Sequence, residues 1–209
     1  WPAASSRRSD CNDFPGRESY SVMKIQWRLW LLMLCTLVSA QAREETLPIA
    51  NGRTITVTVP DGFSYNTGAN AQGDFGFVLI DHKAHVKMQV MLHADEEGLL
   101  LDARERRERL FNEFKGYVEQ SSQGGMQFEE LAPKVGKMTT CLFTDKALIG
   151  KPVSEYPEGE SLHLTVAVKA WAGFVATVML FSNDLKAPQH LAATKVMLES
   201  IHEKPVPLL

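Results

Sequence analysis

Cys141 is the residue of this chain best suited to nucleophilic chemistry. A cysteine acts as a nucleophile when a nearby histidine or positive charge stabilises its thiolate. Cys141 lies in the β-prone run 139–143, which favours burial beside Phe143. Intermolecular disulfide pairing and a reactive thiol are the alternatives. A small thiol-dependent or hydrolytic enzyme would need a histidine that converges on Cys141 in the fold.

His82, His85 and His93 are the candidate metal ligands. In an extended chain that rises about 3.3 Å per residue, His85 and His93 lie roughly 26 Å apart and cannot share an ion. A turn at Lys83 could bring His82 and His85 together with Asp81, but a further protein ligand is not evident. We therefore predict solvent-facing histidines, no metal site and no cofactor.

Two other patterns resemble catalytic or phosphate-binding motifs. Gly68 and Gly73 have the glycine spacing of a phosphate loop, but no Lys-Ser/Thr follows and the segment precedes a predicted strand rather than a helix. Glu129 and Glu130 are adjacent, and successive residues of a strand point apart, so they do not form an acid/base pair. The sequence has no G-x-S-x-G, H-E-x-x-H or C-x-x-C motif. We predict no catalytic residue and no enzyme activity.

Four residues are predicted to bind a partner: Tyr65, Asn70, Tyr156 and Trp171. Tyr65 and Asn70 lie in the predicted loop 65–74, Tyr156 lies in the predicted loop 149–160, and Trp171 lies at a hairpin tip. Long loops on a rigid scaffold often carry function. Trp171 either caps the edge of the core or stands exposed as an anchor for a partner.

The elements that position these residues follow from hydrophobic spacing. Alternating apolar residues predict strands at 54–59, 75–79, 84–92, 126–131, 137–148, 162–170 and 174–181, with a turn at 81–83. The last of these strands is apolar on both faces, which predicts a central strand covered on both sides.

Steps of three and four residues predict two amphipathic helices. The first has an apolar face of Leu100, Ala103, Leu110, Phe111, Phe114 and Val118 and ends at Gly124-Gly125. The charged run 104–109 is interpreted as its solvated face, with partner binding as the alternative. The second has a face of Leu191, Thr194, Met197, Leu198 and Ile201.

The segment from Met23 to Ala42 has the pattern of a cleaved signal peptide. A basic start precedes an apolar run at 29–38, and small residues stand at Ala40 and Ala42. The run is shorter than the roughly 20 residues of a membrane-spanning helix, which predicts no stable membrane anchor. We predict an upstream extension at 1–22, with a disordered tail as the alternative. We also predict cleavage after Ala42, one domain at 43–209, and a periplasmic or secreted location.

The charge of the predicted mature part limits its partners. The chain has 22 basic and 25 acidic residues, and residues 1–42 hold five and three of them, which leaves a net charge of −5 for residues 43–209. Mild acidity without a basic stripe argues against nucleic-acid binding.

The segment 59–63 (Val-Pro-Asp-Gly-Phe) and the closing segment 197–201 (Met-Leu-Glu-Ser-Ile) resemble the PsbP/DcrB-like superfamily over about residues 47–203. The resemblance implies an α/β/α sandwich and an accessory protein that binds partners in an exported compartment, and it assigns no individual residue.

Together these observations predict an α+β fold in which a mainly antiparallel sheet of about six or seven strands is flanked by two main helices. We predict an exported, soluble, non-catalytic binding protein of a bacterial-type cell envelope, with another envelope protein as its partner. The alternatives are the small enzyme described above and a small-ligand or metal carrier.

Overall fold

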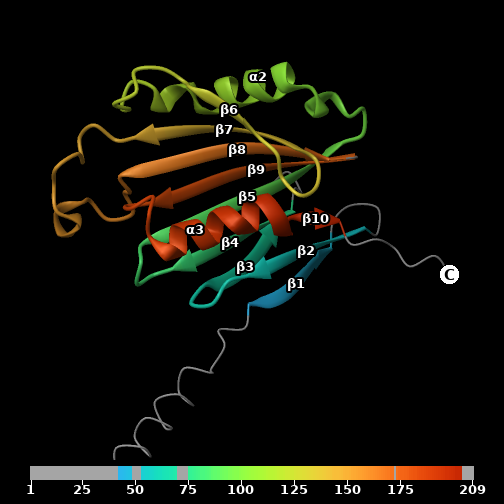
Figure 1. Cartoon of the computed structure of the whole chain (residues 1–209), viewed down its shortest axis with the longest axis horizontal. Helices are drawn as coiled ribbons and strands as arrows, with labels where there is room; N and C mark the ends of the chain where they lie inside the picture. Colours follow the sequence, from blue (N-terminus) through green and yellow to red (C-terminus); the bar gives the residue numbers. More distant parts are fainter. Residues whose placement is uncertain (1–41, 49–52, 70–74, 172, 204–209) are drawn as a thin grey trace, which may run out of the picture. The chain divides into compact units, whose positions relative to one another are not determined.

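A seven-stranded antiparallel sheet forms the centre of the structure, a computed structural model that describes residues 42–48, 53–69, 75–171 and 173–203. Its strand order is β3-β4-β5-β9-β8-β7-β6 (Figure 1). The strands are β3 (Ser64–Ala69), β4 (Phe75–Asp81), β5 (Val86–Asp95), β6 (Phe128–Leu131), β7 (Lys137–Thr144), β8 (His163–Trp171) and β9 (Gly173–Ser182). The predicted antiparallel sheet is confirmed, and residues 23–41 of the proposed signal peptide lie outside the described residues.

A smaller antiparallel sheet has the order β1-β2-β10. Its strands are β1 (Arg43–Pro48), β2 (Thr54–Val59) and β10 (His202–Glu203). The predicted strand 54–59 is confirmed as β2, and its alternate residues Ile55, Val57 and Val59 are buried. The sequence analysis predicts a single sheet that includes this strand, but β2 pairs instead with β1 and β10, neither of which was predicted.

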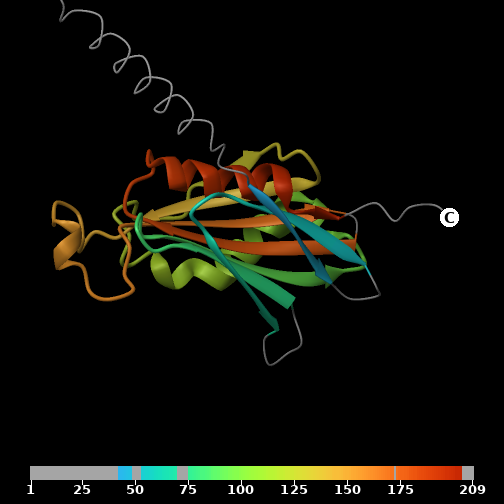
Figure 2. The same cartoon turned by 90° about the horizontal axis from the view of Figure 1, so that it is seen from below.

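The two helices lie on opposite faces of the main sheet (Figure 2), which confirms the sandwich. Helix α2 (Ala103–Phe114) lies on one face, between the short 3-10 turns η2 (Leu99–Leu101) and η3 (Lys115–Tyr117). Helix α3 (Pro188–Lys195) lies on the other face and continues into the π-helical turn η5 (Val196–Ser200). Pro188 occupies the first turn of α3, where its missing N–H costs no hydrogen bond.

Two apolar cores follow from this arrangement. The core on the α2 side includes Leu110 and Phe114, and the core on the α3 side includes Met197, Ile201 and the apolar residues of β2. Strand β9 lies between β5 and β8, and its residues alternate between the two cores. The prediction of a central strand covered on both faces is therefore confirmed.

The predicted helix faces need correction. Helix α2 ends at Phe114 instead of Gly124, and Phe111 is exposed although Leu110 and Phe114 are buried. In the last helix Leu191 is 56% exposed, whereas its neighbour His190 is buried. Each helix therefore meets the sheet along a narrower line than the periodicity indicated.

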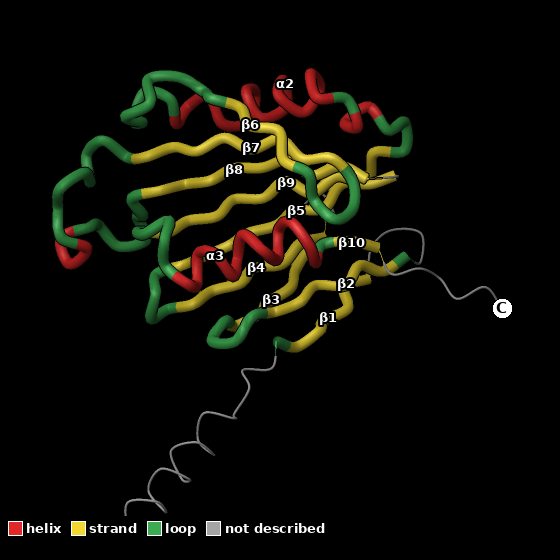
Figure 3. The backbone as a smooth tube through the Cα atoms, viewed as in Figure 1, coloured by secondary structure: helices red, strands yellow, loops and turns green. Residues whose placement is uncertain are grey.

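The loops are partly as predicted. The turn after β4 is confirmed, because Asp81 Oδ1 accepts hydrogen bonds from the amides of Lys83 (2.9 Å) and Ala84 (3.0 Å). Figure 3 shows the predicted loop 149–160 between β7 and β8, interrupted only by the short turn η4 (Val153–Glu155). The predicted loop 65–74 is wrong over 65–69, which belong to the edge strand β3.

Candidate binding surface

Helix α2 covers only part of its face of the main sheet. It packs on β7 and β8, where Val166 and Val168 are fully buried. The cross-strand row through Val166 continues to Met179 on β9, Gln89 on β5 and Val78 on β4, and these three side chains are only half-buried. Within the described residues this area is less covered than the part under α2, and we call it the open half. It is formed by Val78, Ile80, Gln89, Met91, Met179 and Phe181.

Five of the six residues that define the open half are apolar and Gln89 is uncharged, while the exposed Lys87 lies between Ile80 and Phe181 in the row at one end. A hollow of about 380 Å³ lies over β3, β4, β5 and β9. Its floor includes Met91 and Met179, and the flexible methionine side chain suits binding surfaces that must adapt. Gly76 also lines the hollow, where an added Cβ would clash with the backbone carbonyl oxygen of Val90 on β5. The close approach of β4 and β5 at this point therefore requires glycine.

The floor of this hollow contains a polar group without a partner. Thr177 on β9 is mostly buried and lines the hollow. It is the cross-strand neighbour of Met91 on β5. Its Oγ1 has no hydrogen-bond partner within the described residues. Most buried hydroxyls in proteins are hydrogen-bonded, but this oxygen is itself fully buried, so an element laid over the hollow would reach it only after a side-chain rearrangement.

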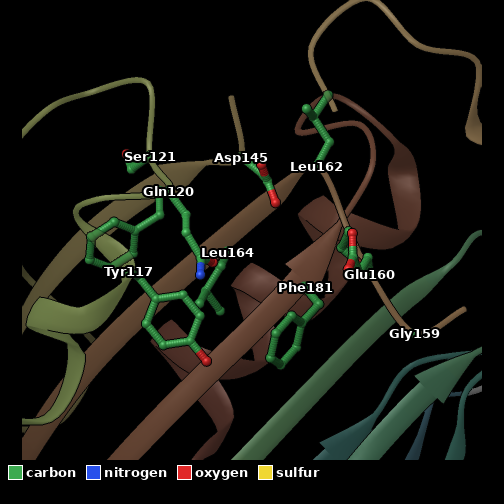
Figure 4. A pocket seen from close by; sticks show the side chains of 11 residues that line it. Tyr117, Gln120, Ser121, Asp145, Gly159, Glu160, Leu162, Leu164 and Phe181 are labelled. Atoms are coloured by element: carbon green, nitrogen blue, oxygen red, sulfur yellow. The ribbon is translucent and has the colours of Figure 1, made fainter. Parts of the chain in front are cut away.

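The end of the 149–160 loop reaches one end of the open half. Two hollows of about 190 and 280 Å³ share Glu160 and Phe181 in their lining. Figure 4 shows the smaller hollow, with Tyr117 and Phe181 on either side of Leu164. The larger hollow includes Lys87, whose Nζ lies 5.9 Å from the centre of the Phe181 ring. This end therefore carries both a cation and a carboxylate.

Three of the four residues predicted to bind a partner lie in described parts of the chain, each on a different element. Trp171 is 4% exposed and stacks on Phe174 at 6.3 Å between ring centres. It therefore caps the core edge and is not the exposed anchor. Tyr65 packs its ring on Phe77 at 5.8 Å on the α3 side of the sheet, and burial together with the charge of Glu45 raises the pKa of its hydroxyl. Tyr156 follows η4 in the 149–160 loop, and Asn70 lies outside the described residues.

Cys141 lies under α2 in the apolar core. It is a free thiol and is 1% exposed. Burial raises the pKa of its thiol, and a backbone hydrogen bond at Gln127 only partly offsets this effect. An activated nucleophile has the opposite shift, so the surroundings of Cys141 are those of a structural cysteine.

The predicted histidines are divided between a turn and a strand. His82 and His85 lie in the exposed turn between β4 and β5, and His93 lies near the end of β5. His85 has a left-handed backbone conformation with φ of 52°. In the part of the chain that the structure describes, no three His, Cys, Asp or Glu residues are arranged to hold a metal ion.

Sequence reasoning missed an ion pair between the buried Arg106 and the partly exposed Glu130, which fixes α2 to the sheet edge. Arg106, assigned above to the solvated face, is 3% exposed, and its guanidinium lies 2.7 Å from Glu130 Oε2 on β6. Arg106 Nε donates to Thr139 Oγ1 at 2.8 Å, and Thr139 donates in turn to Glu130 at 2.9 Å. Burial alone would raise the pKa of the Glu130 carboxyl, but these hydrogen bonds and the charge of Arg106 outweigh it and hold the pKa below its usual value.

Lys169 is a second buried charge that the sequence analysis did not single out. It is fully buried on β8, where it faces Met138 on β7 and Ala176 on β9 across the sheet. Its Nζ donates to the carbonyl oxygen of Met197 in η5 at 3.1 Å. Burial lowers the pKa of its ammonium group to about 8. Lys169 therefore ties the end of the α3 layer to the sheet and cannot reach a ligand in this conformation.

No protein-family model, curated protein or solved structure matches the chain. The resemblance to the PsbP/DcrB-like superfamily stays a prediction. None of the helices in the described ranges has the length and apolar character needed to cross a membrane.

Proposed function

We propose that this chain is an exported, non-catalytic binding protein that holds a partner protein on the open half of its sheet. The observation that carries the proposal is the difference in burial between residues of the same cross-strand row. Val166 and Val168 are sealed under α2, whereas Met179 and Met91 in the same rows as these valines are only half-buried. An apolar sheet face that is left partly uncovered is typical of an interaction surface.

The chemistry of the residues supports binding over catalysis. The core of a protein interface is poor in charged residues and rich in aromatic residues and methionine, with charges at its rim. The open half has this composition, with Lys87 and Glu160 at one end. Cys141, the candidate nucleophile, is buried with a raised thiol pKa, which disfavours the thiol-dependent enzyme.

The compartment is proposed from the sequence pattern at 23–42. A cleaved signal peptide would deliver the chain to the periplasm or the medium, and the acidic mature part is unsuited to nucleic acid. A second exported protein is therefore the proposed partner.

Met179→Glu should abolish capture of the partner from an exported fraction of cells that make the protein. A carboxylate in the middle of the apolar face would have to be desolvated on binding, so we expect at least a tenfold loss of the captured protein. Leu191→Glu is the matched control, because Leu191 is 56% exposed on α3 at the other face. Quantitative mass spectrometry of the captured fraction, with circular dichroism of both variants, measures the effect.

Equal capture by the wild type and the folded Met179→Glu variant would contradict the assignment of the surface. Loss of capture in both variants would also contradict it, because the effect would not depend on the open half.

The carrier alternative is supported by a cavity of about 500 Å³ on the α3 side, lined in part by Thr140, Thr165 and His190. Its volume lies within the range of small-molecule sites. A ligand held there would be unaffected by Met179→Glu, which separates this function from the proposed one.

A further inference from the structure

We propose that the partner covers the open half with a single amphipathic α-helix that lies beside α2. This inference rests on the proposed function and names the element that the surface accepts. Such a helix would extend the α2 layer of the sandwich across the strands that α2 leaves uncovered.

The width of the open half fits one helix. Strands β9, β5 and β4, which carry the six residues of the open half, are consecutive neighbours in the sheet, and two gaps of about 4.8 Å make a width of about 10 Å. A helix with its side chains is about 10–12 Å across. The surface is therefore wide enough for one helix and too narrow for two.

Helix α2 shows what kind of element packs on these rows. It buries Leu110 and Phe114 on the β7–β8 half, where they join Val166 and Val168 in one core. The same rows continue on the open half with side chains of similar character, Met179 and Met91. A second helix with apolar residues at matching spacing would bury these side chains as α2 buries their neighbours.

The charges around the open half set the pattern of the partner helix. The centre, at Gln89 and Met179, is uncharged, and Lys87 and Glu160 stand at one end. His82 and His85, in the turn between β4 and β5, line the hollow of about 280 Å³ at that end. The partner helix therefore needs an uncharged apolar stripe, with charged side chains of both signs at the end that meets Lys87 and Glu160.

A pair of synthetic peptides tests this inference directly. The first, of about 14 residues, places leucines at i, i+3, i+4 and i+7 and fills its other face with Glu–Lys pairs. The second has the same composition in a scrambled order without an apolar stripe. Fluorescence anisotropy measures binding to the full chain, and circular dichroism measures helix formation on binding.

We expect the striped peptide to bind at least tenfold more tightly than the scrambled peptide and to gain helicity when bound. Met179→Glu should remove this preference, whereas Leu191→Glu should retain it. Equal binding of the two peptides, or binding without a gain of helicity, would overturn the helical partner.

The failure of this inference is distinguishable from the failure of the proposed function. If the peptides fail to discriminate but partner capture still depends on Met179, the partner uses another element and only the helical assignment is wrong. If neither peptide binding nor partner capture depends on Met179, both proposals are wrong.

Discussion

Replacement of Lys169 by methionine should raise the free energy of unfolding by about 2 kcal/mol near pH 7. Lys169 is fully buried in an apolar row of the sheet, and the carbonyl of Met197 is the partner of its ammonium group. The fall of its pKa from 10.5 to about 8 corresponds to a penalty of about 3 kcal/mol for the charged form. Loss of the hydrogen bond offsets about 1 kcal/mol of the gain.

The stability gain of Lys169→Met should become smaller as the pH rises. Because the folded-state pKa lies below the unfolded value, the unfolded chain binds more protons between about pH 8 and 10.5. The contribution of Lys169 therefore makes the wild type more stable as the pH rises through this window. The stability difference between Lys169→Met and the wild type should shrink over the same window.

Urea unfolding at several pH values measures both effects. Lys137→Met is the matched control, since Lys137 is exposed on the neighbouring strand β7, and we expect a change within about 0.5 kcal/mol. A Lys169→Met protein that is less stable than the wild type at every pH would show that the lysine is a net stabiliser and would refute this account of its burial.

Arg106→Ala should destabilise the fold by about 2 kcal/mol, because the buried guanidinium makes charge-assisted hydrogen bonds that alanine cannot replace. Glu130 is 34% exposed and also binds Arg107, so it keeps part of its compensating charge and the loss is smaller than for a fully buried ion pair. Here both Glu130 and Thr139 lose hydrogen bonds, and α2 loses its attachment to the β6–β7 edge. Thermal or urea unfolding measures the effect.

The neighbouring Arg107 supplies a close control. It binds the same carboxylate at 3.1 Å but is 48% exposed, against 3% for Arg106. Exposed ion pairs contribute less than about 1 kcal/mol, so Arg107→Ala should have a small effect. Because the pKa of Glu130 is lowered in the folded state, its stabilising contribution is lost as the pH falls through that value. Equal losses from both alanine variants would contradict the buried role of Arg106.

The strands were predictable because each has one consistent buried face. In β2 and β5 the apolar residues alternate without interruption, so periodicity located both strands and the turn between β4 and β5. The edge strand β3 was not predictable in this way. Its residues 66–69 are exposed and contain Gly68, so local composition resembles that of a loop, and the pairing with β4 decides the structure.

The burial of Arg106 and Lys169 was not predicted, for a different reason in each case. Arg106 lies in a run of charged residues, and its partner Glu130 is 24 residues away, so only the packing of α2 against β6 brings them together. The burial of Lys169 was predictable from its neighbours in the sequence. Lys169 lies between Ala167 and Trp171 on a strand whose other face is also apolar, which indicates burial on both faces.

The open half could not be predicted from the sequence alone. Met91, Met179 and Phe181 have the alternation of core residues, and nothing in the pattern says how far α2 extends across the sheet. The surface becomes evident only when the cross-strand rows are followed from beneath α2 to the uncovered strands.

The most direct test of the open half as the binding surface is methionine methyl NMR during titration with the captured partner. The chain supplies its own controls, because Met91 and Met179 lie on the open half, whereas Met88 and Met197 are buried on the α3 side. We predict that the methyl signals of Met91 and Met179 shift on binding while those of Met88 and Met197 stay unchanged. Binding that shifts Met88 or Met197 and leaves Met91 and Met179 unchanged would contradict the proposed surface.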